Sequence, residues 1–318
     1  MLFRFFGFAL IGAIVQCFLS DRFGRKWSNA VAGICLVIGN ALQAGSVDVA
    51  MFLVARFITG FGCGMLLSNT PVYLSEISPA HSRGLLVGLM GNTLTFGYVV
   101  SSLAALGFNY VTSAYQWRLN FIVALGFALM LLGSLLVLPE SPRWLVAHGR
   151  GAEAGKILKS IHKTADDPEG HVAAAELIQI TAQVELDRTL PSSWGYILFR
   201  DPAMRKRTIC TLLVWSAAQS TSITVLANLT PRLFGALGYS PVLQLGLGAA
   251  WTVALCSGCL PANYLIDRVG RVKLLGKCIP IIDFGQASLT SAFSYRRIWY
   301  GCSPCYRSCT SITISGWP

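Results

Sequence analysis

Long apolar runs separated by short charged segments dominate the first 275 residues of this 318-residue chain. A helix that spans a membrane needs about 20 mostly apolar residues. Seven runs approach that length: 2–19, 30–45, 50–68, 85–106, 121–138, 209–227 and 243–266. Unpaired backbone groups are costly in hydrocarbon, so a span must be either a helix or a strand of a closed barrel. The apolar residues are continuous rather than alternating, which argues against barrel strands. We therefore predict an all-α fold, a polytopic membrane bundle of about seven transmembrane helices.

One polar stretch, residues 141–207, interrupts this pattern and predicts a cytoplasmic linker of two or three helices. Asp167, Pro168 and Glu169 are typical of a helix start, since they supply a cap, a preset first turn and a favourable charge. Apolar residues then follow at near-helical spacing: Leu177, Ile180, Val184 and, one residue off the face, Leu186. The segment Ala152–His162 predicts a second short helix. The chain divides into an N-terminal membrane half (1–140), the linker (141–207), a partial C-terminal membrane half (208–275) and an irregular tail (276–318).

The distribution of charge predicts the orientation of these helices. The chain is 54% hydrophobic, only 12% charged, and carries a net charge of +11. Four segments that would lie on one side hold 18 of the 25 lysines and arginines: 20–29, 75–84, 139–207 and 267–277. Basic loops face the cytoplasm in membrane proteins. Short basic loops, rather than one basic domain, argue against a nucleic-acid partner. We expect a multi-pass membrane protein with the lipid bilayer as its main partner.

Cysteine and histidine do not indicate a metal site or an enzyme. Ten cysteines are present, and several lie inside apolar runs, where cysteine behaves as a small hydrophobic residue. Cys256 and Cys259 have the spacing of a metal pair, but the same run offers no partner pair for the four ligands of a zinc site. No Ser/His/Asp or phosphate-loop arrangement is recognisable. We expect no catalytic residue, no metal and no cofactor.

A charged turn occurs twice. Residues 21–26 read Asp-Arg-Phe-Gly-Arg-Lys, residues 267–271 read Asp-Arg-Val-Gly-Arg, and each follows a long apolar run. The same turn at equivalent ends of two spans predicts a protein built from two related halves. That is the architecture of transporters in which one half rocks against the other.

Four further motifs lie within or at the ends of the predicted spans. They are Arg56 with Gly60, Gly62 and Gly64; Pro71, Tyr73 and Glu76; Arg83-Gly84; and Pro-Glu-Ser-Pro-Arg-Trp-Leu at 139–145. Together with the two charged turns, in this order and at these spacings, they resemble the sugar porter family of the major facilitator superfamily, in the style of its fungal hexose-transporter-like members. The resemblance covers about residues 5–275.

The resemblance implies twelve spans, cytoplasmic helices between the halves and a sugar bound midway, with the plasma membrane as the site of the full-length family member. It also implies that the first family span precedes residue 1 and that the ninth to twelfth follow residue 275. We therefore expect a partial major facilitator fold whose transport of a sugar or related polyol by alternating access is impaired in the chain as written. A non-transporting membrane sensor, a regulatory protein and an inactive gene fragment remain alternatives.

The charged motifs predict a cytoplasmic latch that pairs acids and bases across the ends of the spans. An ordinary basic loop that only orients the protein is the alternative. The latch residues are Asp21, Arg22, Gly24, Arg25, Glu76, Arg83, Glu140 and Arg143, with Asp267, Arg268 and Arg271 in the second half.

Only a few residues are candidates for contact with the substrate, because this chain has only part of the family's pattern of polar residues in the spans. The family has a glutamine where this chain has Gly91, and in the seventh span the resemblance retains Gln219. Gln219 is the first candidate, followed by Asn92, Thr224 and Asn228, which could instead form hydrogen bonds between helices. Arg56 is an intramembrane charge, and the resemblance implies an acidic partner in the first family span, as in proton-coupled members. Proton symport and facilitated diffusion are both left open.

Overall fold

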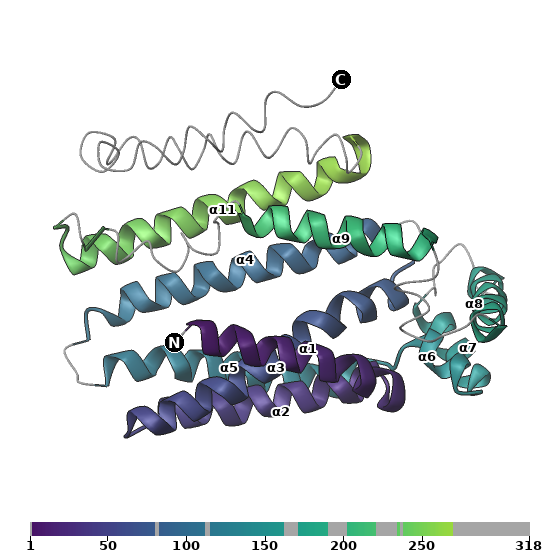
Figure 1. Ribbon diagram of the computed structural model, residues 1–318, viewed down its shortest axis with the longest axis horizontal. Coiled ribbons are helices and arrows are strands. Elements are labelled where there is room, and N and C mark those ends of the chain that lie inside the picture. Colours follow the sequence, from purple (N-terminus) through teal and green to yellow (C-terminus); the bar gives the residue numbers. More distant parts are fainter. Residues whose placement is uncertain are drawn as a thin grey trace. The chain divides into compact units, whose positions relative to one another are not determined.

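The computed structural model describes residues 2–79, 83–111, 115–161, 171–189, 202–220, 234–235 and 238–269. Within these ranges the secondary structure is helical, and no strand occurs (Figure 1). The long helices are α1 (Leu2–Phe23), α2 (Arg25–Ala44), α3 (Val49–Ile77), α4 (Arg83–Phe108), α5 (Gln116–Val137), α9 (Pro202–Ser220) and α11 (Pro241–Val269). Three helices lie between α5 and α9 in the sequence: α6 (Pro142–Ala147), α7 (Gly151–Ile161) and α8 (His171–Thr189).

Six helices in the described part of the chain are long and apolar enough to cross a membrane. They lie at Phe5–Phe23, Arg25–Ala44, Val49–Ile77, Gly84–Phe108, Gln116–Val137 and Pro241–Cys259. Each matches one predicted apolar run, so the helical membrane bundle is confirmed. The remaining run, 209–227, begins in α9 and continues into residues outside the described ranges. Helix α3 is longer than its apolar run because it continues through Pro71 to the charged end at Glu76.

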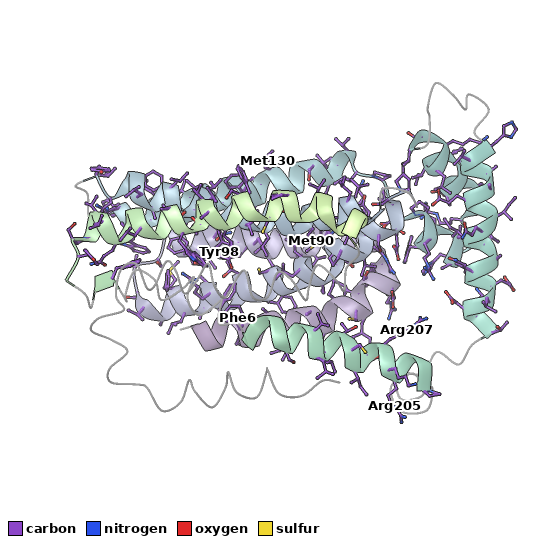
Figure 2. The ribbon with its side chains drawn as sticks, turned by 90° about the horizontal axis from the view of Figure 1, so that it is seen from above. Phe6, Met90, Tyr98, Met130, Arg205 and Arg207 are labelled. Carbon is purple, nitrogen blue, oxygen red and sulfur yellow. The ribbon has the colours of Figure 1, made fainter. Side chains whose placement is uncertain are left out.

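The distribution of side chains in the spans is inverted relative to a water-soluble protein. Large apolar residues lie on the outside: Met130 is 72% exposed (Figure 2). Leu136 and Val137 are 83% and 88% exposed. Buried positions in α2 and α3 are instead held by small and polar residues such as Ala32 and Asn69. This distribution fits helices that face hydrocarbon outward and meet one another through small side chains.

Glycines in α3 allow α1 and α2 to approach it closely. A Cβ added to Gly60 would lie 2.7 Å from the Phe5 carbonyl oxygen in α1, and one added to Gly64 would overlap the Ala9 carbonyl. Gly62 points to the other neighbour, because its Cβ would lie 2.9 Å from the Ala32 oxygen in α2. The alternating glycines therefore place α3 between α1 and α2, which brings the polar ends of all three helices together.

Helices α6, α7 and α8 form a small cluster of their own around Leu145, Val146, Ala154 and Val184. Leu177 and Ile180 of α8 pack against this core. Leu186 is 61% exposed, as its position off the apolar face predicts. The predicted start of this helix at Asp167–Glu169 lies outside the described residues, within which α8 begins at His171.

Candidate functional site

The turn between α1 and α2 consists of one residue, Gly24. Its φ of 96° lies in the left-handed region, which residues with a side chain rarely adopt. Space is also lacking, because a Cβ at this position would lie 2.6 Å from Oε2 of Glu140. Glycine is therefore required twice over, by the backbone and by the carboxylate that lies against it.

Glu140 reaches the start of α2 from a position 115 residues later in the chain. Its Oε1 accepts hydrogen bonds from the backbone N–H groups of Arg25 (2.8 Å) and Lys26 (3.1 Å), and from that of Ser141 (3.0 Å). The first N–H groups of a helix have no partner within the helix, and the helix dipole makes this end positive. Glu140 supplies both the missing acceptor and the favourable charge.

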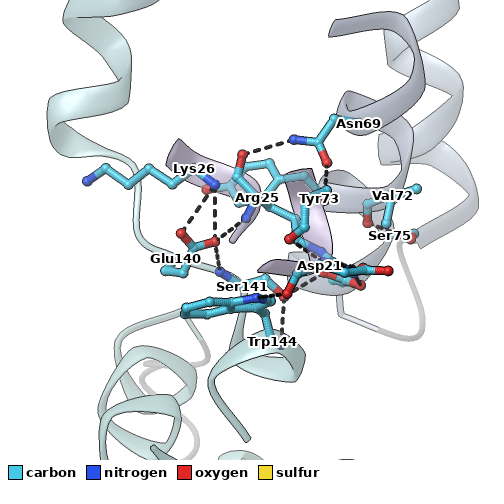
Figure 3. A network of polar contacts seen from close by, with 12 residues as sticks. Asp21, Arg25, Lys26, Asn69, Val72, Tyr73, Ser75, Glu140, Ser141 and Trp144 are labelled. Carbon is cyan, nitrogen blue, oxygen red and sulfur yellow. Dashed lines mark hydrogen bonds and ion pairs between the residues drawn. The ribbon is translucent and has the colours of Figure 1, made fainter. Parts of the chain in front are cut away.

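Arg25 joins α2 to α3 and α1 through its guanidinium (Figure 3). Nε and Nη2 donate to the two carboxylate oxygens of Glu76, at 3.1 and 3.2 Å. Nη1 donates to Oδ1 of Asp21 (3.0 Å) and to the carbonyl oxygen of Ser20 (2.8 Å). The Arg25 and Glu76 side chains are only 14% and 9% exposed, whereas Asp21 is 76% exposed. The Arg25–Glu76 pair is thus the one sheltered from solvent. Its two parallel hydrogen bonds make it stronger than the single hydrogen bond between Arg25 and Asp21.

One face of α3 supplies the polar contacts of this cluster. Asn69, Tyr73 and Glu76 follow one another at spacings of four and three, so they lie on the same side of the helix. Asn69 donates to Oδ1 of Asn29 (2.8 Å) and to the Arg25 carbonyl (2.9 Å), and it accepts from the Ser20 hydroxyl (2.9 Å). The Tyr73 hydroxyl donates to the Pro139 carbonyl (2.7 Å).

The same cluster fixes the start of the α6–α8 group. Ser141 donates from its hydroxyl to Oε2 of Glu76 (2.6 Å) and accepts from the backbone N–H of Trp144 (3.4 Å) as the N-cap of α6. The Trp144 indole donates to the Asp21 carbonyl (3.0 Å). We call Asp21, Arg25, Glu76, Glu140 and Ser141 the Arg25 network. It joins the ends of three membrane helices to the linker.

The structure brings only part of the predicted latch into this network. Asp21, Gly24, Arg25, Glu76 and Glu140 meet, whereas Arg143 has no ion pair or side-chain hydrogen bond with a span end among the described residues. Its guanidinium instead binds Asp187 of α8 at 2.8 Å. The reason is local, because Arg143 follows the Ser141 cap and lies on the outer side of α6, 46% exposed.

The remaining predicted latch residues have fewer described contacts. Arg22 is exposed and lies 5.9 Å from the ring centre of Phe23. The side chains of Arg83, Asp267 and Arg268, and all of Arg271, lie outside the described part of the structure. Their pairing therefore stays a prediction.

Several residues of the cluster carry no charge, and the charged motifs of the sequence do not identify them. Ser20, Asn29 and Asn69 are 6%, 5% and 2% exposed. A signal was available: Asn69 precedes Tyr73 and Glu76 on one helical face, and buried amides inside a span need partners. Charged motifs are easier to recognise than single polar residues within an apolar run.

The predicted substrate contacts are not assembled into a described pocket. Asn92 is in α4 and 8% exposed. The side chain of Gln219, and both Thr224 and Asn228, lie outside the described residues. A cavity of about 380 Å³ lies between α2, α4 and α5, but its lining is mostly apolar and Asn92 does not contribute to it. The substrate residues therefore stay predictions.

Arg56 lies in α3 between aromatic rings. Its guanidinium carbon is 5.2 Å from the ring centre of Phe52 and 5.5 Å from that of Phe121. No acidic side chain pairs with it among the residues that the structure describes. Cation–π contacts can lower the cost of this charge inside a bundle, but they do not remove it.

The chemistry of the described site is non-covalent. Within the described ranges, no group of three or more histidine, cysteine or acidic side chains could hold a metal ion. The Arg25 network instead contains charge-assisted hydrogen bonds between helix ends. Such a network can hold a set of helices in one arrangement and can be broken and remade as a unit.

Comparison with known families gives a match over most of the chain. The profile of the family described as "Sugar (and other) transporter" matches residues 4–297. Among curated proteins, the MFS-type transporter criB of Aspergillus cristatus is 30% identical over 261 residues, which are 82% of this chain and 56% of that protein. The low-affinity glucose transporter HXT3 of Saccharomyces cerevisiae is 31% identical over 83% of this chain and 46% of its own length.

A plant protein is similar to this chain as well. Inositol transporter 4 of Arabidopsis thaliana is 32% identical over 84% of this chain and 46% of its own length. The chain thus spans about half the length of the curated relatives that it matches.

Solved structures show the same fold. The proton:xylose symporter XylE bound to 6-bromo-6-deoxy-D-glucose superposes with a TM-score of 0.74 at 23% identity, over 84% of this chain and 59% of that one. A partially occluded, inward-open form of XylE from E. coli superposes with a TM-score of 0.72 at 23% identity, over 92% of this chain and 68% of that one. The predicted major facilitator fold is therefore confirmed.

Proposed function

Because this chain belongs to the sugar (and other) transporter family, we propose that it forms part of a carrier that moves a sugar or polyol across a membrane by alternating access. The observation that carries this proposal is the Arg25 network, which gathers the ends of α1, α2 and α3 and the start of the linker at one point. Alternating access requires groups of helices that move as units. The network supplies the contacts that make such a unit.

Within this proposal the Arg25 network is the cytoplasmic latch. A hydrogen bond to a charged group contributes about 1.5–3 kcal/mol. The sheltered Arg25–Glu76 pair and the Glu140 cap together could therefore bias a two-state equilibrium by a few kcal/mol. Arg143 and Asp187 are about half exposed and belong to the linker surface. We assign them no part in the latch.

The substrate class follows from the named relatives. One is a glucose transporter and another an inositol transporter, and both names describe compounds with several hydroxyl groups. Such compounds are held by side chains that both donate and accept hydrogen bonds. Gln219 is our first candidate for this role, with Asn92, Thr224 and Asn228 as further contacts. Arg56, which lies beside two aromatic rings and has no acidic partner among the described residues, is the candidate for charge coupling to protons.

Uptake of labelled compounds tests this function. The longest product of the gene is expressed in yeast that lacks its own hexose carriers, and uptake of glucose, xylose, inositol and sorbitol is measured. We expect saturable uptake of at least one of them, reduced more than tenfold in Gln219→Ala. Leu213→Ala, a change at an exposed apolar residue of α9, is the matched control and should leave uptake unchanged. Absence of uptake for all four, with the protein at the cell surface, would overturn the proposal.

A further inference from the structure

A cavity of about 570 Å³ lies between the α1–α2 turn and the linker helices α6 and α7. Cations, carboxylates and aromatic rings contribute to its wall, including Arg22, Lys26 and Trp27. Figure 3 shows the Lys26 side chain extending away from Arg25, so its ammonium is not part of the Arg25 network. The cavity is therefore a separate feature that shares only its Glu140 wall with that network.

The two carboxylates of the wall are already occupied. Glu140 accepts hydrogen bonds from the backbone at the start of α2. Both oxygens of Glu153 bind Arg150, at 2.9 and 2.6 Å. The side chains of Arg22 and Lys26, by contrast, have no hydrogen-bond acceptor among the residues that the structure describes. The wall thus holds three cations, Arg22, Lys26 and Arg150, and two carboxylates, which leaves a net charge of +1. Arg22 and Lys26 are the two cations of the wall without an acceptor among the described residues.

Aromatic residues place this cavity at the level where a membrane meets water. Phe23 is the last residue of α1 and 53% exposed, and Trp27 lies in the first turn of α2 and is 67% exposed. Tryptophan at the end of a span lies among lipid headgroups. Basic pockets at the cytoplasmic ends of transmembrane helices bind anionic headgroups.

We propose that this cavity binds the phosphate of an anionic phospholipid from the cytoplasmic leaflet, with Arg22 and Lys26 as its charge partners. Phe23 and Trp27 would lie beside the glycerol and the first part of the acyl chains. A soluble phosphate would meet the same two cations but would leave both exposed rings uncovered, so the lipid is the better occupant. The proposal rests on the cytoplasmic orientation of these span ends and does not depend on the transported compound.

Lipid binding to the purified full chain tests the proposal. The protein in neutral detergent is titrated with phosphatidylserine or phosphatidylcholine, and bound lipid is counted by native mass spectrometry. A cation near an anionic lipid surface contributes about fivefold in affinity, so Arg22→Gln with Lys26→Gln should weaken phosphatidylserine binding about 30-fold. Binding of phosphatidylcholine should not change. The variant Arg22→Lys with Lys26→Arg keeps both charges and should bind phosphatidylserine nearly as the parent does.

Lys156 and Lys159 give the matched control. Both are exposed on α7, outside the cavity, and their change to glutamine removes the same charge. If this control loses as much phosphatidylserine binding as the cavity variant, the lipid is attracted by the positive charge of the surface in general, and the proposal is overturned. Unchanged binding in Arg22→Gln with Lys26→Gln would overturn it too. Displacement of phosphatidylserine by an equal concentration of inorganic phosphate would assign the cavity to a soluble anion instead. Transport does not enter the measurement, so its result stands apart from the test of the carrier.

Discussion

Two arginine–carboxylate pairs at the linker end of the molecule have nearly the same length and very different surroundings. Arg25 and Glu76 meet at 3.1 Å with side chains 14% and 9% exposed, whereas Arg143 and Asp187 meet at 2.8 Å with side chains 46% and 55% exposed. Glu76 also accepts from the Ser141 hydroxyl, and Arg25 also binds the Ser20 carbonyl. The comparison teaches that burial and supporting hydrogen bonds, more than distance, separate a structural network from a surface pair.

The largest expected effect comes from removing one partner of the sheltered pair. Glu76→Ala leaves the Arg25 guanidinium largely buried with only the exposed Asp21 as a counter-charge. Loss of one partner of a buried pair costs about 3–5 kcal/mol, and we expect about 3 kcal/mol here because Asp21 remains. Denaturant unfolding of the purified protein, followed by helical circular dichroism, measures this free energy. Asp187→Ala is the control and should cost less than about 0.5 kcal/mol; equal losses in the two variants would contradict the comparison.

A smaller effect is expected at the turn that brings the Arg25 network together. Gly24→Ala places a Cβ against Glu140 and holds an alanine at a left-handed φ that it rarely adopts. We therefore expect the free energy of unfolding to fall by about 2 kcal/mol. Gly149 is the matched control, because its φ is 77° but a Cβ there would meet nothing within 4 Å. Gly149→Ala should show the backbone cost alone, about 1 kcal/mol. If the free energy of unfolding falls equally at both glycines, the position of the Glu140 carboxylate does not require the absence of a side chain at Gly24.

The smallest effect is expected for the exposed pair in a double-mutant cycle. Arg143→Gln and Asp187→Asn, alone and together, should show a coupling energy below about 0.5 kcal/mol that vanishes in high salt. The same cycle at Arg25 and Glu76 should show more than about 1 kcal/mol and little dependence on salt. Thermal unfolding in detergent at low and high salt measures both. Coupling at Arg143 that equals or exceeds that at Arg25 would reverse our assignment of the latch.

Much of the fold could be predicted from the sequence, because the membrane makes a simple demand. Six apolar runs correspond to six helices. Glycines inside a span favour close packing of helices, and those at 60, 62 and 64 lie at the contacts of α3 with its neighbours. The extension of α3 beyond its apolar run could not be read from hydropathy, since Pro71 suggests an end to the helix, whereas the helix continues through it to Ile77.

The site was harder to predict than the fold. Charged motifs identify residues that gather at helix ends, but they do not identify partners. Arg143 is only three residues from Glu140, and yet Glu140 binds the start of α2 while Arg143 binds α8. That choice is made by the cap at Ser141, which turns the chain between them. Asn69, at the centre of the polar cluster, carried no charge to mark it.

The most direct test of the central claim is sugar uptake in the cycle of Arg25→Gln and Glu76→Gln, measured on the longest product of the gene in yeast that lacks hexose carriers. If the two residues work as one latch, Glu76→Gln alone leaves the sheltered Arg25 with only the exposed Asp21 as a counter-charge and should reduce uptake strongly. The double variant has neither sheltered charge and leaves only the exposed Asp21 unpaired, so its uptake should lie well above the product of the two single effects. Single effects that simply multiply in the double variant, with all proteins equally abundant at the cell surface, would contradict the account.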